Sequence, residues 1–126
     1  MLNTPPVLAI HLCNLVLKDL RREFKNLKEI DEFSRKKSEV IYAAVEGNDR
    51  FYCPVAKEFR SRMNVIFKSS NEEIEKEFLR KAEEEFGMIQ LKGHRSVGGL
   101  RASLYNAVTL ENTLKLAEHI CGEAKQ

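Results

Sequence analysis

Apolar residues recur at the three-to-four-residue spacing of a helix in four separate stretches, and this pattern constrains the fold more than any other feature. The stripe nearest the start of the chain consists of Leu8, Leu12, Leu15, Val16, Leu20, Phe24 and Leu27. Thr4 and the two prolines after it are typical of a helix start, because Thr caps free amides and Pro needs no amide partner. We therefore predict a long first helix that reaches about residue 29.

Three further helices are expected after the first. The second spans residues 30–46 and ends at Gly47, which begins a Gly-Asn-Asp turn. The third opens with Ser70-Asn71-Glu72-Glu73, which matches a capping box with Ser70 as the cap, and Gly87 ends it. Thr109 can cap the last helix. The residues expected to face inward from that helix are Leu110, Leu114, Ala117 and Ile120.

Short strands are expected between these helices. Alternating apolar and polar residues predict a strand at 63–68, and two shorter strands are expected at 88–91 and 100–105. Residues 50–59 form an irregular segment or a short strand, because Pro54 argues against a central one. The resulting order is helix, helix, strand, helix, strand, strand, helix. This order predicts an α+β fold with a small, mainly antiparallel sheet and helices packed on one face.

The composition is that of one ordinary soluble domain. The chain has 126 residues, of which 43% are hydrophobic and 32% are charged, with a net charge of +2. This charge balance does not indicate a nucleic-acid or membrane partner, and no apolar run reaches the roughly 18 residues of a membrane span. The three cysteines include no Cys-x-x-Cys pair. We therefore expect reduced thiols, a cytoplasmic location and no metal site.

The segment 92–101 carries the densest cluster of unusual chemistry. Its three glycines allow the backbone to approach a ligand closely, and its positive donors are Lys92, His94, Arg95 and Arg101. An arginine fork matches a carboxylate or a phosphate, so two arginines across a Gly-Gly turn suit a molecule with two anionic ends. On the residues alone, a solvated basic loop remains an alternative. A nucleic-acid contact has less support, because no aromatic residue interleaves the charges.

Three separate motifs occur in order along the chain. They are Asn3-Thr4-Pro5-Pro6, Arg60-Ser61-Arg62-Met63-Asn64 and the segment LKGHRSVGGLRASLYNAV at 91–108. Together they resemble phosphoserine aminotransferases, which are class V, pyridoxal-phosphate-dependent enzymes of the aspartate aminotransferase-like fold type I. The resemblance implies a C-terminal small domain of that fold. Residues 1–29 would form a long interdomain-type helix and residues 30–126 the small domain, without the large cofactor-binding domain.

The resemblance also implies an activity and roles for particular residues. Enzymes of this family are homodimers that move an amino group between phosphoserine and 2-oxoglutarate in serine biosynthesis, giving 3-phosphohydroxypyruvate and glutamate. By resemblance, His94 and Arg95 would hold the substrate phosphate or the distal carboxylate of glutamate. Arg101 would hold the α-carboxylate. Asn3 and Thr4 would reach the phosphate of pyridoxal 5'-phosphate in the neighbouring subunit.

The residues that perform the chemistry are expected elsewhere. Pyridoxal phosphate needs a Schiff-base lysine and an acidic partner for its ring nitrogen, and in the family both precede the position of Asn3. Lys92 does not match the family's Schiff-base position. We therefore expect the chain alone to contain no catalytic residue, to bind no cofactor and not to transaminate. Two alternatives stay open: a stand-alone anion-binding module derived from the domain, and a purely structural dimerisation fragment.

Overall fold

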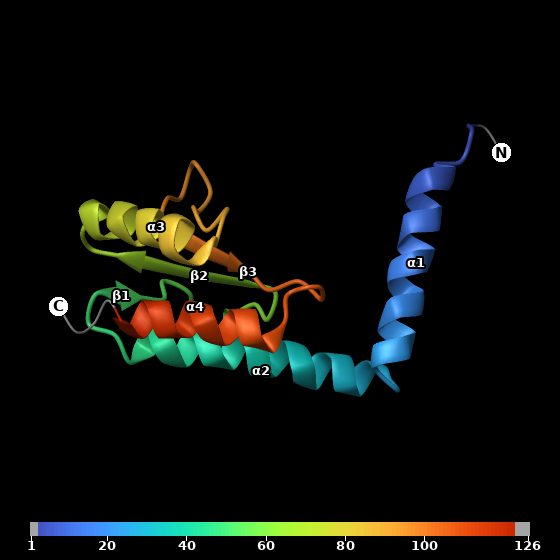
Figure 1. Ribbon diagram of the computed structural model, residues 1–126, viewed down its shortest axis with the longest axis horizontal. Coiled ribbons are helices and arrows are strands. Elements are labelled where there is room, and N and C mark those ends of the chain that lie inside the picture. Colours follow the sequence, from blue (N-terminus) through green and yellow to red (C-terminus); the bar gives the residue numbers. More distant parts are fainter. Residues whose placement is uncertain (1–2, 123–126) are drawn as a thin grey trace. The chain divides into compact units, whose positions relative to one another are not determined.

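The computed structural model describes residues 3–122 (Figure 1). The chain divides into two compact units, residues 1–33 and 34–126. The first unit contains α1 (Val7–Glu23) and the first turns of α2 (Leu27–Glu46). No residue of α1 is buried, although its sequence is rich in apolar side chains. Basic residues in its last turn, Arg21 and Arg22, complement the negative end of the helix dipole.

The first helix is shorter than the sequence predicted, at both of its ends. Pro6 occupies the N-cap position without a side-chain cap, so the predicted capping role of Thr4 is wrong. At the other end, Phe24 is extended, and a new helix begins at Leu27. The reason is local hydrogen bonding: the Asn26 side chain accepts from the amide of Glu29 at 3.1 Å, and the Glu29 carboxylate accepts from the amide of Lys25 at 2.9 Å.

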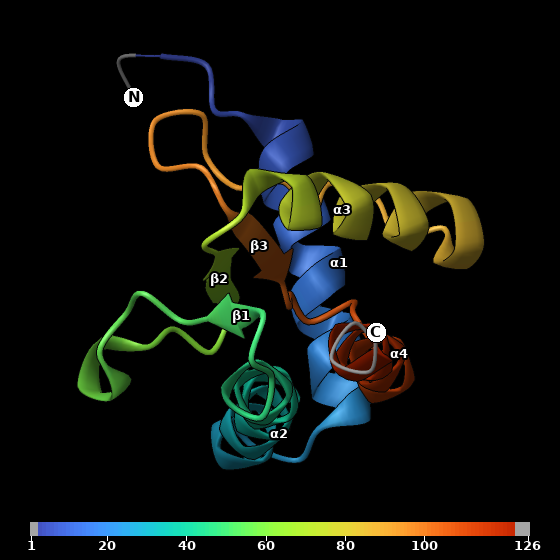
Figure 2. The same cartoon turned by 90° about the vertical axis from the view of Figure 1, so that its left-hand side faces the viewer.

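The second unit contains a three-stranded antiparallel sheet in the order β1-β2-β3 (Figure 2). Its strands are β1 (Phe51–Tyr52), β2 (Asn64–Ser69) and β3 (Leu100–Ser103), and a 3₁₀ helix (Lys57–Phe59) lies between the first two. Val65 lies opposite Ala102 and Phe67 opposite Leu100. All four are buried, whereas the residues between them are half-buried, as strand alternation requires. One face of the sheet therefore meets the core.

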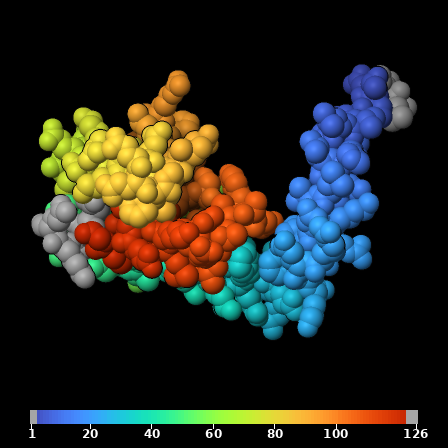
Figure 3. All heavy atoms as spheres, in the orientation of Figure 1, coloured from blue at the N-terminus to red at the C-terminus, as the bar shows by residue number. Residues whose placement is uncertain are grey.

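The helices of the second unit supply the rest of that core. They are the later part of α2, α3 (Glu72–Phe86) and α4 (Leu110–Gly122), which bury Ile41, Phe78 and Ile120 respectively. Helices α3 and α4 lie next to each other in Figure 3. Between them, the buried His119 ring stacks on Phe78 with centroids 4.3 Å apart. The small antiparallel sheet with helices over its buried face confirms the predicted α+β fold class.

Several local predictions need correction. Asn71, rather than Ser70, caps α3, because its side chain accepts from the amide of Glu73 at 2.8 Å. The expected strand at 88–91 does not form: Gln90 adopts a left-handed φ of 61°, and only an isolated bridge between Lys92 and Leu100 follows.

In α4, the expected inward position of Leu114 is wrong, since its side chain is exposed and Thr113 is buried instead. The predicted ends at Gly87 and Thr109 are confirmed: Gly87 is left-handed at φ 64°, and the Thr109 hydroxyl accepts from the amide of Asn112 at 3.2 Å. Within residues 3–122, no helix has the length and apolar character needed to cross a bilayer.

Candidate functional site

The glycine-rich segment forms a compact turn with its own backbone hydrogen bonds. The His94 carbonyl accepts from the amides of Val97 at 3.1 Å and Gly98 at 2.8 Å. At the base of the loop, the Gly93 amide donates to the Gly99 carbonyl at 2.8 Å. A Cβ on Gly93 would lie 2.4 Å from the Gly98 carbonyl oxygen, so this close crossing of the two loop arms requires glycine. The segment is therefore a turn of defined geometry, although its tip is exposed to solvent.

The loop is also attached to the neighbouring strand. The Lys68 ammonium, on β2, donates to the Val97 carbonyl at 2.6 Å. Gly99 has φ 75°, and a Cβ there would lie 2.6 Å from the Lys68 Cγ and 3.0 Å from the Phe67 carbonyl oxygen. The Lys68 stem therefore crosses directly over Gly99. This packing fixes the direction in which the loop leaves the sheet.

Two of the predicted site residues lie at the exposed tip of this turn. The His94 Nδ1 atom lies 2.8 Å from the Ser96 hydroxyl and accepts from the Ser96 amide at 3.3 Å. The Ser96 contacts therefore orient the imidazole and leave Nε2 pointing away from them. Arg95 is exposed and makes no hydrogen bond or ion pair with any residue of the described chain. Both side chains can accordingly meet an anion from solvent.

Arg101 lies at the foot of the same loop, on the half-buried face of β3 opposite Ile66. Its backbone amide donates to the Leu91 carbonyl at 2.7 Å. Its Nε atom is buried and has no hydrogen-bond partner among the residues that the structure describes. A buried, unpaired donor of a charged group is costly, so this nitrogen is suited to a partner that comes from outside the chain.

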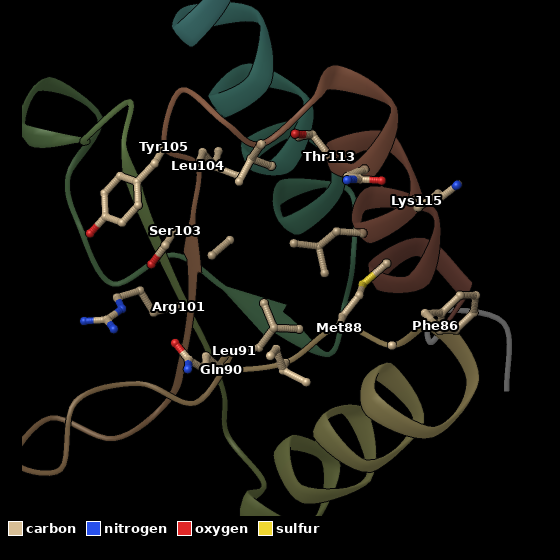
Figure 4. Close-up of a pocket in the computed structure, with 16 residues that line it drawn as sticks. Phe86, Met88, Gln90, Leu91, Arg101, Ser103, Leu104, Tyr105, Thr113 and Lys115 are labelled. Carbon is tan, nitrogen blue, oxygen red and sulfur yellow. The ribbon is translucent and has the colours of Figure 1, made fainter. Parts of the chain in front are cut away.

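A cavity of about 700 Å³ opens beside Arg101 (Figure 4). Its floor is apolar and includes Met88, Leu91 and Leu104, while its walls come from the end of α3, the segment before the loop, β3 and α4. Because Arg101, Ser103 and Tyr105 occupy alternate positions, they project from the same side of the strand in Figure 4. Gln90 lies close to Arg101 in this view. Polar residues also line the cavity on the side of α4, where Thr113 and Lys115 lie.

The structure brings three predicted residues, His94, Arg95 and Arg101, onto one loop-and-strand segment. His94 and Arg95 do not line the cavity, which Arg101 does. Asn3 and Thr4 belong to the first unit, where both are exposed just before α1. The sequence analysis assigned no role to Gln90, Ser103 or Tyr105. The positions of Ser103 and Tyr105 could have been predicted, because they follow Arg101 at the two-residue spacing of a strand. No sequence pattern indicated the left-handed conformation of Gln90.

Other kinds of site find no support in the described part of the chain. Its His, Cys, Asp and Glu residues form no group that could hold a metal ion. Cys13, Cys53 and Cys121 are free thiols. The residues of the loop and of β3 define the class of domain. It is a small α+β unit that presents the guanidinium groups of Arg95 and Arg101 and the imidazole of His94 near a partly apolar cavity.

Comparison with known proteins identifies the relatives of this domain. No protein-family profile matches the chain. The phosphoserine aminotransferase of Drosophila melanogaster is 51% identical over 122 residues, which are 93% of this chain and 33% of that enzyme. Chloroplastic phosphoserine aminotransferase 1 of Arabidopsis thaliana is 47% identical over 90% of this chain and 26% of its own length.

Solved structures give the same answer. Phosphoserine aminotransferase from Bacillus circulans subsp. alkalophilus superimposes with a TM-score of 0.84 at 42% identity, over 96% of this chain and 34% of that one. The pyridoxal-phosphate-bound enzyme from Trichomonas vaginalis gives 0.86 at 32% identity, over 95% and 34%. The chain is therefore related to phosphoserine aminotransferases over nearly all of its length and spans about a third of theirs. The resemblance found in the sequence is confirmed.

Proposed function

We propose that the chain is the C-terminal, substrate-binding domain of a phosphoserine aminotransferase, which exchanges an amino group between phosphoserine and 2-oxoglutarate in serine biosynthesis. The observation that carries the proposal is the buried Arg101 Nε atom, which lacks a partner within the described residues and belongs to a residue of the cavity lining. A carboxylate can satisfy this donor and a second nitrogen of the same guanidinium through two parallel hydrogen bonds.

The proposed roles divide the substrate between two places. Arg101 holds the α-carboxylate, which phosphoserine and glutamate share. His94 and Arg95 hold the other end, a phosphate in phosphoserine and a carboxylate in glutamate. The exposure of both side chains and the Ser96 contacts of His94 support this assignment, since His94 is oriented and both side chains are open to an anion.

The same proposal includes the cofactor and the assembly. Asn3 and Thr4 are exposed polar residues directly before α1, and amide and hydroxyl groups near a helix start suit a phosphate. In a cytoplasmic homodimeric enzyme they would hold the phosphate of pyridoxal 5'-phosphate in the partner subunit. The bound cofactor would supply the electron sink for amino transfer. Residues 1–29, which contain α1 and the start of α2, would form the interdomain segment, and residues 30–126 the small domain.

Calorimetric titration of the 126-residue chain with phosphoserine and with 2-oxoglutarate tests the proposal. We expect both dianions to bind, and Arg101→Ala to weaken binding by tenfold or more, since hydrogen bonds to charged groups contribute about 1.5–3 kcal/mol. Arg35→Ala, which removes an exposed arginine from α2, is the matched control and should leave binding unchanged.

Three outcomes would count against the proposal. Equal binding by wild type and Arg101→Ala would remove the α-carboxylate role. No binding of either dianion would favour the alternative of a structural dimerisation module. Salt-sensitive binding of a short oligonucleotide, with no binding of the dianions, would indicate a nucleic-acid contact instead.

A further inference from the structure

A lysine is completely buried beside the cavity. Lys37, on α2, has an exposed fraction of 0% and is among the largest fully buried side chains of the protein. Its ammonium donates to three backbone carbonyls: those of Leu104 at 3.1 Å, Tyr105 at 2.8 Å and Val108 at 2.9 Å. An ammonium has three protons, so these bonds use its full donor capacity.

The three carbonyls all belong to the connection between β3 and α4. This connection turns at residues 105–108, where the Val108 amide also donates to the Tyr105 carbonyl at 2.9 Å. At its start, the Leu104 amide donates to the Met63 carbonyl at 2.7 Å, which joins it to the chain just before β2. The connection is therefore held from two directions: by Met63, just before β2, and by Lys37, on α2.

The connection also forms part of the cavity. Leu104, Tyr105 and Val108 all line it, and Leu104 directly follows the last residue of β3, the strand that carries Arg101. In Figure 4, Tyr105 and Arg101 lie on the same side of that strand, with Ser103 between them. A movement of the connection would therefore displace Tyr105 and the end of the strand that carries Arg101.

Holding an ammonium in this position is costly. Burial removes its hydration and lowers the pKa of Lys37 below its ordinary value. An apolar residue would avoid that cost in a position needed only for packing. A charged lysine at this position is explained if the three carbonyls must be held in place, because a group with three diverging donors is needed to bind all of them at once.

We propose that Lys37 is a positioning residue for the substrate site: its buried ammonium holds the Leu104–Val108 connection so that Tyr105 and Arg101 face the same ligand. The inference rests on the proposed function, because it concerns how the same site is held. Lys37 itself does not touch the ligand.

The test compares Lys37→Met with Lys36→Met, which removes an exposed lysine from the neighbouring position on the same helix. Phosphoserine affinity is measured by calorimetry at a temperature at which circular dichroism shows every variant to be folded. We expect about a tenfold weaker affinity for Lys37→Met, the scale of a displaced contact group, and no change for Lys36→Met. Backbone amide shifts of residues 101–108 should move in Lys37→Met alone.

A purely structural lysine would behave differently: Lys37→Met would melt at a lower temperature but bind phosphoserine as wild type does, and this result would overturn the inference. Lys37→Arg keeps a cation with several donors and should bind more tightly than Lys37→Met; equal weakening of the two would also count against it. If Lys37→Met does not fold, Lys37→Arg against wild type decides: shifted amides at residues 104–108 with unchanged affinity would be the refuting result.

The outcomes also separate this inference from the proposed function. Loss of binding in Arg101→Ala together with normal binding in the Lys37 variants would overturn only the positioning role. Absence of phosphoserine binding by the unaltered chain would overturn both.

Discussion

Gly99→Ala perturbs the point at which the candidate anion-binding loop joins the sheet. An added Cβ would lie 2.6 Å from the Lys68 Cγ and 3.0 Å from the Phe67 carbonyl oxygen, and φ at this residue is 75°. Gly98→Ala provides a matched control one residue away. Gly98 has φ 69°, but a Cβ there would meet no atom within 4 Å. The two substitutions therefore share the backbone strain and differ in the contact.

The expected magnitudes follow from these two terms. A left-handed conformation costs an L-residue about 1–2 kcal/mol, and replacing glycine recovers about 0.4–1 kcal/mol through the unfolded chain. Gly98→Ala should therefore lower the free energy of unfolding by about 0.5–1 kcal/mol. Overpacking adds about 1–3 kcal/mol. Gly99→Ala should accordingly cost about 2–3 kcal/mol, because the Phe67 backbone oxygen cannot move aside as a side chain can.

Urea unfolding followed by circular dichroism measures both values. The contact with Lys68 can be isolated by a double-mutant cycle with Lys68→Ala, which removes the Cγ atom and leaves the Phe67 carbonyl in place. We expect Lys68→Ala to recover about 1 kcal/mol of the Gly99→Ala cost and none of the Gly98→Ala cost. Equal costs for the two glycine substitutions, or a cycle without coupling, would refute the explanation.

Two further predictions concern the core and the surface. Phe78→Ala removes a fully buried ring that packs edge-on against two other aromatic rings. It should lower the free energy of unfolding by about 3–5 kcal/mol in the same urea assay. Phe59→Ala, which removes an exposed ring, should change that free energy by less than about 0.5 kcal/mol. A hydrogen bond from Arg60, at 2.6 Å, lowers the pKa of the Glu46 carboxyl. The contribution of this hydrogen bond to the free energy of unfolding is present above the ordinary carboxyl pKa of about 4.5 and is lost as the pH falls through the lowered pKa of Glu46. Glu46→Gln should therefore flatten the acid side of a plot of stability against pH, whereas Glu39→Gln on the same helix should not. A plot unchanged by Glu46→Gln would exclude the effect.

Helical periodicity predicted the architecture because the core takes its residues from regularly spaced positions. The stripes of α2, α3 and α4 include the buried residues Ile41, Phe78 and Ile120, and Gly87 marks a helix end at which a left-handed residue is needed. These features depend only on neighbours in the sequence. For the same reason, the fold class could be predicted without knowledge of the tertiary structure.

The errors have identifiable causes. The first helix was predicted to continue to residue 29 because the apolar spacing continues through Phe24 and Leu27. The break arises from Asn26 and Glu29, whose side chains accept hydrogen bonds from backbone amides at the start of α2. The predicted strand at 88–91 depended on short-range composition. Gln90 interrupts this strand with a left-handed conformation, which glutamine rarely adopts.

The residues of the candidate site could be predicted, but their burial and hydrogen bonding could not. The glycines and cations of segment 92–101 identified the loop, and the relatives at 42–51% identity support its family assignment. Neither the buried Nε of Arg101 nor the burial of Lys37 is visible in the sequence, because each depends on residues far along the chain. Lys37 and the most distant of its three acceptors, the Val108 carbonyl, are separated by 71 positions.

Under the proposed function, the different surroundings of the three anion-binding residues would explain how one site accepts two substrates. Arg101 is half-buried on a strand, and its buried Nε fixes the direction from which a carboxylate can approach. His94 and Arg95 are exposed on a turn, where Ser96 orients His94 and the Arg95 side chain can adjust. Phosphoserine and 2-oxoglutarate share the carboxylate at one end and differ at the other. A rigid donor for the common group and adaptable donors for the variable group would accommodate both substrates without a change in the backbone.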